Sequence, residues 1–451
     1  MKKVILLAII YSVSVNLLFS QKFERNYDEL KVGSYSLPDP LIMLDGAKIT
    51  NVRQWEKQRV YWIKLFSENM YGFTPQNKVE LRFEVIEEKS DALNNLAIRR
   101  RVNIYFKDYP DLLPIELILY VPKSTMKPVP VFLSLNYVGN HGITTEADIP
   151  VSDRWMQNGF DKSGKGIINW RANENSRGLQ TRRWPLEAIL SRGYGVATAY
   201  YGDIEPDHPK GWKSGIRLVL GDTLKNNNWG AIGAWAWGMS RMMDYLITDK
   251  LVDKNKVIAL GHSRLGKTAL WAGAQDERFA MIISNCSGEG GAALTRRNFG
   301  ENQSDITMMP YWYCNNYFNY RDRVNDLPFD QHILLSLIAP RYLYIGSASK
   351  DLWADPQGEF LGAVNAGKVY ALYGKKGIGT DSWPPISTPI GENIGYHLRD
   401  GVHDILQYDW ERYMDFADKK FESTPISNFT PKSPKRDYCK LLSTPPRGSG
   451  G

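Results

Sequence analysis

Residues 257–274 read VIALGHSRLGKTALWAGA. The apolar run at 257–260 predicts a buried strand, and the segment from Thr268 onward predicts a helix. Ser263 lies between them, at a sharp turn flanked by Gly261 and Gly266. A strand-turn-helix corner of this kind holds a serine in a strained, exposed conformation at the edge of a sheet. The stretch therefore predicts a parallel α/β sheet that presents Ser263.

This corner is how α/β-hydrolases present their nucleophile, although the spacing here is G-x-S-x-x-G, one residue longer than the usual G-x-S-x-G. A bare string of this form also fits an ordinary turn with a capping serine. Arg264, next to the serine, offers its backbone N–H at the start of a helix whose dipole favours negative charge. Its guanidinium could reach the same developing oxyanion.

The segments on either side support this fold class. Residues 79–86, 97–106 and 115–121 are β-rich and partly alternating, which favours an antiparallel start to the sheet. Further strands are predicted at 129–135, 195–200, 281–284 and 341–346, and helices at 55–66, 185–191, 229–248, 358–372 and 405–421. The sequence thus predicts an α/β-hydrolase fold, a three-layer sandwich with a central, mostly parallel sheet and an antiparallel N-terminal edge.

The chain has 451 residues, of which 43% are hydrophobic, so it can bury a large core. We expect a single domain over residues 21–424, with an irregular N-terminal lead-in. Residues 143–181 show little periodicity and are expected to form an insertion that shapes a cleft. Residues 425–451 are rich in Pro, Ser and Gly and are expected to be loosely ordered.

Residues 1–20 have a basic start, an apolar centre and a small-residue end, and this predicts a secretory signal peptide. The mature protein should begin near Gln21 and be secreted or periplasmic, with no membrane span. Three cysteines occur, and export favours a disulfide between Cys286 and Cys314, with Cys439 left over. No C-x-x-C or Cys/His ligand spacing occurs, so no metal or other cofactor is expected. The net charge of +7 is spread along the chain, which does not indicate nucleic-acid binding.

A serine nucleophile needs a base, and in α/β-hydrolases the partners follow in the order Ser, acid, His. Three histidines lie beyond the serine corner: His332, His397 and His403. His332 lies at a predicted helix start and is interpreted as structural. His397 and His403 both fall in the predicted loop before the last helix, and Gly401 just upstream makes His403 the preferred base.

The acid has three candidates at this point. Asp351 follows the predicted strand at 341–346, a position that suits a carboxylate orienting the histidine. Asp355 lies in the same loop, and Glu289 lies in the loop after the preceding strand. Position alone does not separate them, because any loop carboxylate can instead be solvated or cap a helix.

These motifs resemble the glucuronoyl esterases of carbohydrate esterase family fifteen, of the bacterial kind. The residues that carry the resemblance are Ser263-Arg264-Leu265-Gly266-Lys267, Ser287-Gly288-Glu289-Gly290-Gly291, Phe299-Gly300-Glu301, Tyr311-Trp312, Asp351-Leu352-Trp353-Ala354-Asp355-Pro356 and His403-Asp404. The resemblance extends from about Asn136 to the last helix. It implies a secreted α/β-hydrolase that cleaves esters of glucuronic acid.

The resemblance also implies roles for individual residues. The nucleophile would be Ser263, the base His403 and the charged oxyanion stabiliser Arg264. The residues that hold the glucuronate ring would be Lys267, Glu301 and Trp353.

The chain departs from the family pattern in two places. Many members carry the acid of the triad where this chain has Cys286, and a cysteine cannot orient a histidine as a carboxylate does. The resemblance therefore implies Asp351 as the acid, since some bacterial members possess it. Fungal members also carry a disulfide cysteine beside the serine, where this chain has His262.

The leading hypothesis is a secreted, monomeric serine esterase that cleaves the ester between (4-O-methyl-)glucuronoyl groups of xylan and lignin-type alcohols. Glucuronoxylan or a lignin-carbohydrate ester would be its substrate. An acetyl-xylan or other carbohydrate esterase on the same scaffold is the first alternative, because side chains named from sequence do not settle the size of the acyl group. A non-catalytic carbohydrate-binding protein that kept the fold is the second.

Overall fold

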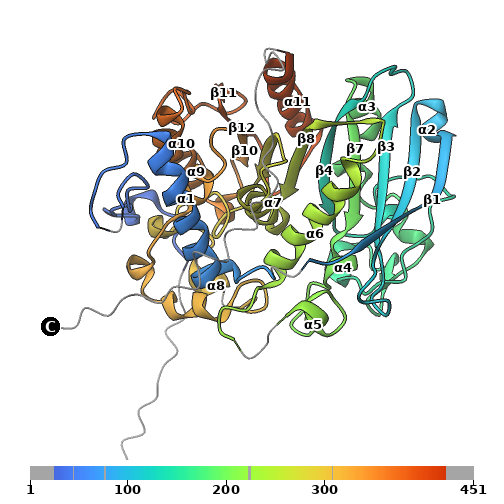
Figure 1. The fold of residues 1–451 in the computed structure, drawn as a ribbon, viewed down its shortest axis with the longest axis horizontal. Coiled ribbons are helices and arrows are strands. Elements are labelled where there is room, and N and C mark those ends of the chain that lie inside the picture. The colour runs from blue at the N-terminus through green and yellow to red at the C-terminus, as the bar shows by residue number, and fades with distance from the viewer. Residues whose placement is uncertain (1–24, 44, 76–77, 222–224, 307, 423–451) are drawn as a thin grey trace, which may run out of the picture.

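The computed structural model describes residues 25–43, 45–75, 78–221, 225–306 and 308–422 (Figure 1). Its centre is a ten-stranded sheet with the strand order β1-β2-β3-β7-β4-β8-β9-β10-β12-β11. The strands are β1 Leu81–Asp91, β2 Ala97–Phe106, β3 Ile115–Pro122, β4 Val129–Asn136, β7 Gly195–Tyr200, β8 Val252–His262, β9 Met281–Asn285, β10 Tyr342–Ala348, β11 Ile390–Gly391 and β12 Ile394–Arg399.

The sheet is parallel in its middle and antiparallel at its edges. Strands β1, β2, β3 and β7 pair antiparallel in that order, whereas β7, β4, β8, β9, β10 and β12 are parallel to one another. The central strands are buried over nearly their whole apolar length, as expected where helices cover both faces. The predicted fold class, including the antiparallel N-terminal edge, is confirmed.

Helices cover both faces and complete three layers (Figure 1). One face carries α1 Val52–Phe66, α6 Ala231–Leu246, α7 Arg264–Gln275, α9 Gln331–Ser336 and α10 Pro356–Leu372, and the other carries α3 Leu186–Ser191 and α11 Gln407–Glu422. Neighbouring strand residues alternate between the two cores: Leu133 packs in the first and Phe132 in the second. The short helices are α2 Ala92–Asn95, α4 Tyr201–Ile204, α5 Arg217–Leu220 and α8 Gln303–Ile306.

Some predictions about local structure differ from the structure or lie outside it. Residues 394–399 were expected to be loop but form the buried strand β12, so His397 is a strand residue. The segment 143–181 contains short 3-10 turns and a small two-stranded sheet, β5 Ile167–Ile168 with β6 Arg171–Ala172. The predicted signal peptide and tail lie outside the described residues. Within the described part of the chain, no helix combines the length and apolarity of a membrane span.

The parallel strands place the predicted site residues at one edge of the sheet. Ser263 follows β8, Cys286 follows β9, Asp351 follows β10 and His403 follows β12. Because parallel strands end on the same side, the loops after these four neighbouring strands meet there.

Candidate active site

The serine corner joins β8 directly to α7. Ser263 has φ 57° and ψ −131°, a conformation that costs a residue with a side chain on the order of 1–3 kcal/mol. A Cβ on Gly261 would lie 1.8 Å from the carbonyl oxygen of Leu265, so only glycine fits this close approach of strand and helix. A Cβ on Gly266 would lie 3.0 Å from the Ser284 hydroxyl oxygen. The glycines that flank the serine therefore let α7 start against the sheet.

A cavity of about 410 Å³ opens beside this corner. It is lined by all seven residues that the sequence predicts for the site: Ser263, Arg264, Lys267, Glu301, Asp351, Trp353 and His403. Other residues of its wall include Cys286, Asp305, Met309 and Trp312. The tertiary structure thus gathers positions 140 residues apart in the chain around one space.

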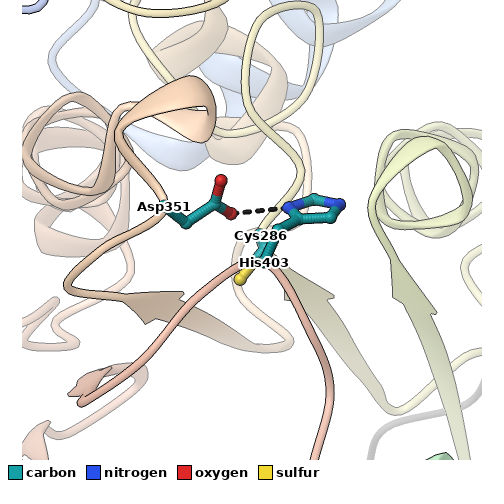
Figure 2. A group of neighbouring side chains, drawn as sticks. All are labelled: Cys286, Asp351 and His403. Atoms are coloured by element: carbon teal, nitrogen blue, oxygen red, sulfur yellow. Dashed lines mark hydrogen bonds and ion pairs between the residues drawn. The ribbon is translucent and has the colours of Figure 1, made fainter.

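His403 and Asp351 form a hydrogen-bonded pair at this cavity (Figure 2). The distance from His403 Nδ1 to Asp351 Oδ2 is 2.6 Å, and Asp351 is buried. A carboxylate at Nδ1 favours the proton there in the neutral ring and leaves Nε2 with a free lone pair. Figure 2 shows the second ring nitrogen on the side away from Asp351. This geometry suits a base that an acid orients. The centre of the His403 ring lies 4.6 Å from that of His262, the residue before Ser263.

The two rival acids are engaged with other partners. Glu289 accepts a hydrogen bond from the Tyr317 hydroxyl at 2.7 Å. Burial raises the pKa of Glu289 to about 8, although this hydrogen bond favours the charged form. Asp355 pairs with Arg297 at 2.9 Å and caps the N-terminus of α10. Among the described residues, neither Glu289 nor Asp355 makes the hydrogen bond to His403 that Asp351 makes.

The two rival histidines make contacts away from the cavity. His397 was expected in a loop but is fully buried within β12, where its Nε2 lies 2.8 Å from Asp409 Oδ1. His332 has its Nε2 2.9 Å from the carbonyl oxygen of Pro38, a contact that fits the structural role predicted for it. Of the three histidines beyond the serine corner, His403 is the one that lines the cavity.

The guanidinium of Arg264 is held by a carboxylate that the sequence analysis missed, Asp207. Its Nη1 pairs with Asp207, whose other oxygen accepts from Trp312 Nε1 at 2.7 Å and from the Tyr311 hydroxyl at 3.0 Å. Burial lowers the pKa of Arg264, but the negative charge of Asp207 outweighs this and raises it, so the side chain stays charged. Its Nε–H is buried and finds no hydrogen-bond partner among the described residues. This free donor lies on the residue next to Ser263.

The sequence carried a weak signal for Asp207. The residue follows β7 by seven positions, and carboxyl ends of parallel strands are where functional side chains gather. The link to Arg264, 57 positions away, exists only in the folded chain.

Lys267 and Glu301 form a buried ion pair in the cavity wall. Lys267 Nζ lies 2.8 Å from Glu301 Oε2, and the lysine side chain is only 2% exposed. Lys267 also donates to the backbone carbonyl of Glu289. The Glu301 N–H donates to the Trp353 carbonyl at 2.7 Å, which ties the two loops together. The three residues expected to hold a sugar ring are therefore one connected unit.

The N-terminal lead-in supplies a further residue beside the cavity. The Arg25 guanidinium lies over the Trp353 ring at 4.8 Å and pairs with Asp305 at 2.8 Å. The backbone of the same segment is fixed where Gly300 N–H donates to the Asn26 carbonyl at 2.8 Å. No sequence motif identifies Arg25 as a site residue, because the N-terminal segment has no regular pattern.

Cys286 occupies the loop after β9 as expected, but the predicted disulfide is wrong. Cys286 and Cys314 are both free and buried, and their sulfurs lie near different backbone carbonyls, those of Asp404 and Glu68. The two residues fall in loops that tertiary folding places apart, which proximity to the site in sequence could not reveal.

The ligand atoms of Cys286, Asp351 and His403 lie within 4.8 Å of one another (Figure 2). The Asp351–His403 hydrogen bond occupies one potential ligand atom of each of these two side chains. We therefore interpret Asp351 and His403 as a hydrogen-bonded pair rather than as metal ligands.

A mostly parallel sheet of this order, with a serine on a strained strand-helix turn and a histidine on a later loop, defines an α/β-hydrolase. The family model "Glucuronyl esterase, fungi" matches residues 223–374. Carbohydrate esterase MZ0003, from an unknown prokaryotic organism, is 45% identical over 406 residues, which is 89% of this chain and 93% of the relative. The chain belongs to the glucuronoyl esterases of carbohydrate esterase family fifteen.

Solved structures agree with this assignment. A promiscuous CE15 esterase from a marine bacterial metagenome is 45% identical with a TM-score of 0.82, over 88% of this chain and 99% of the other. A glucuronoyl esterase from Solibacter usitatus is 44% identical with a TM-score of 0.82, over 87% and 100%. The family resemblance is confirmed, the protein is a carboxylic ester hydrolase, and the non-catalytic alternative is set aside.

Proposed function

We propose that this protein hydrolyses the ester between 4-O-methyl-glucuronoyl groups of xylan and lignin-type alcohols. A relative from Podospora anserina, 33% identical over 45% of this chain and 41% of its own length, is a 4-O-methyl-glucuronoyl methylesterase. The observation that carries the proposal is one cavity that joins Ser263, the His403–Asp351 pair, Arg264 and the Lys267–Glu301 pair.

The first half of the proposed reaction forms an acyl-enzyme. Ser263 Oγ attacks the carbonyl carbon of the ester while His403 Nε2 takes its proton, and Asp351 stabilises the imidazolium that results. The negative charge that develops on the carbonyl oxygen is met by the guanidinium of Arg264, whose charge is permanent. The bond to the alcohol oxygen then breaks, and that oxygen leaves with the proton from His403.

The second half releases the acid. A water molecule gives its proton to His403 and adds to the acyl carbon, and Arg264 again faces the oxyanion. Ser263 Oγ then leaves and regains its proton. The products are an alcohol and a uronate carboxylate, so the reaction turns a neutral acyl group into an anion.

Recognition of the sugar falls to groups that read hydroxyls and ring faces, because an ester has lost the free carboxylate. Glu301 accepts from ring hydroxyls, and Lys267, with two of its three N–H groups engaged by protein oxygens, offers the third to a sugar oxygen. Trp353 bounds the ring.

A second candidate is hydrolysis of acetyl or other carbohydrate esters in the same cavity. It is favoured by the promiscuity stated for the 45% identical esterase from the marine metagenome. The two candidates share the chemistry at Ser263 and differ in whether Lys267 and Glu301 contribute to the transition state.

Comparing a benzyl glucuronate ester with an aryl acetate on one preparation tests the proposal. We expect kcat/KM to favour the uronate ester, and Ser263→Ala to abolish both activities. A higher kcat/KM on the acetate would reject the uronate preference in favour of the second candidate.

Export is also proposed, and its evidence is the sequence of residues 1–20. We propose that the mature enzyme works outside the cytoplasm as a monomer. Light scattering on the purified mature chain tests the monomer, and a dimer mass would reject it.

A further inference from the structure

Asp207 is unusually well held for a loop carboxylate. The residue follows α4 in the chain, and its side chain is fully buried. It accepts from the Tyr201 hydroxyl at 3.1 Å, the Tyr311 hydroxyl at 3.0 Å and Trp312 Nε1 at 2.7 Å, in addition to Arg264. Four donors on two oxygens fix its orientation, so the direction in which it holds Arg264 is fixed as well.

The guanidinium of Arg264 is confined on its other sides by aromatic rings. Its central carbon lies 4.9 Å from the Trp312 ring and 5.8 Å from the rings of both Tyr137 and Phe160. With Nη1 engaged by Asp207, this cage leaves Nε–H as a buried donor without a partner among the described residues. Asp207 thus engages one of the three guanidinium nitrogens and fixes the orientation of the other two, Nε and Nη2.

The negative charge of Asp207 also affects how the cavity binds charged molecules. In the proposed reaction a neutral ester becomes a carboxylate next to Ser263, and a free cation there would retain the product, since charges attract strongly in a partly buried site. The other cation in the cavity wall, Lys267, is paired with Glu301 at 2.8 Å, and Arg25, beside the cavity, is paired with Asp305 at 2.8 Å. The site therefore presents no uncompensated cation among its described residues.

Resting on the proposed function, we propose that Asp207 is a positioning residue for Arg264. It aims the guanidinium at the oxyanion and compensates its positive charge with the negative charge of its own carboxylate, so that the cavity binds the neutral ester more readily than the uronate it releases.

The positioning is tested by a double-mutant cycle of Asp207→Asn and Arg264→Ala on benzyl glucuronate. We expect Asp207→Asn alone to lower kcat by about ten- to a hundredfold with KM within about threefold, since misplaced catalytic groups cost rates of this order. In the Arg264→Ala background it should change kcat by less than about threefold, because the residue acts through Arg264. Equal losses in both backgrounds would overturn the positioning role.

The charge compensation is tested by inhibition with free glucuronate. Asp207→Asn should lower the inhibition constant by about tenfold, and the gain should shrink as ionic strength rises. The matched control is Glu205→Gln: Glu205 is a buried carboxylate two residues away that pairs with Arg217 at 2.7 Å, outside the cavity wall. Glu205→Gln should leave the inhibition constant unchanged. An unchanged constant in Asp207→Asn, or an equal change in the control, would overturn the compensation.

Asp207→Glu separates the two effects and serves if the asparagine variant does not fold. It keeps the charge but shifts the guanidinium, so kcat should fall while inhibition by glucuronate stays at the wild-type level; stronger inhibition, or an undiminished kcat, would count against the proposal. If Arg264→Ala itself left kcat unchanged, the oxyanion role in the proposed function would fail. If only the Asp207 variants had no effect, this inference alone would fail.

Discussion

Replacing Asp351 with asparagine should disable the base without disturbing the fold. The carboxylate is 3% exposed and lies 2.6 Å from His403 Nδ1, so the amide fills the same space. Asparagine removes the negative charge that stabilises the imidazolium, and its NH₂ group favours the wrong tautomer of the ring.

The magnitude follows from the geometry. Opposite charges centred about 4 Å apart interact by about 4 kcal/mol at an effective dielectric constant of about 20. Because each 1.36 kcal/mol is a factor of about ten in rate, the lost charge alone costs about a thousandfold in kcat. The tautomer error raises the loss to about ten-thousandfold, as in the Ser-His-Asp template.

The assay is kcat on a benzyl glucuronate ester, with circular dichroism and the melting temperature measured to verify the fold. The matched control is Glu289→Gln, a second buried acid close in sequence to the site, which should keep kcat within about threefold of wild type. The reasoning would be refuted if Glu289→Gln lost activity while Asp351→Asn kept it.

Four further predictions concern the nucleophile, a buried acid, the sugar-reading pair and export. Ser263→Ala and Ser263→Gly should both lose up to about a millionfold in kcat. The glycine variant should unfold at a higher denaturant concentration than the alanine variant, because φ 57° suits glycine. Equal unfolding midpoints for the two variants would show that the corner is not strained. Glu289, with its pKa raised to about 8, contributes stability that is complete below its ordinary pKa of 4.5 and is lost as pH rises through 8. As pH rises from 5 to 8, the free energy of unfolding should therefore fall in wild type but not in Glu289→Gln, so that the difference between them changes in favour of the variant by at most about 4 kcal/mol. The same pH dependence in both proteins would contradict this. Lys267→Met and Glu301→Gln should each lower kcat/KM on glucuronate esters about ten- to a hundredfold while barely affecting an aryl acetate, and the double variant should recover stability but not selectivity; equal losses on both substrates would indicate a purely structural role. Intact mass of the exported protein should begin near Gln21, and a retained Met1 would reject the signal peptide.

The difference between predicted and observed features has a physical pattern. Strands with continuous apolar runs, such as β4 and β9, were found at nearly their observed bounds because burial on both faces demands that composition. Strand β12 was missed because it carries His397 and Arg399, which are tolerated there only through their pairing with Asp409. The disulfide prediction failed because loops near one site need not bring their sulfurs together.

The sequence by itself determined the fold class, because this depends on local order: a strand-turn-helix corner with glycines around Ser263, and polar residues at strand ends. Together with the family resemblance, it also named seven of the residues that line the cavity. Only the tertiary structure decided the partners. The pairing of His403 with Asp351, the hold of Asp207 on Arg264 and the approach of Arg25 to Trp353 join positions 52, 57 and 328 residues apart. Hydrogen bonds and charges act over a few ångströms in space, and separation along the chain does not predict which carboxylate lies within that range.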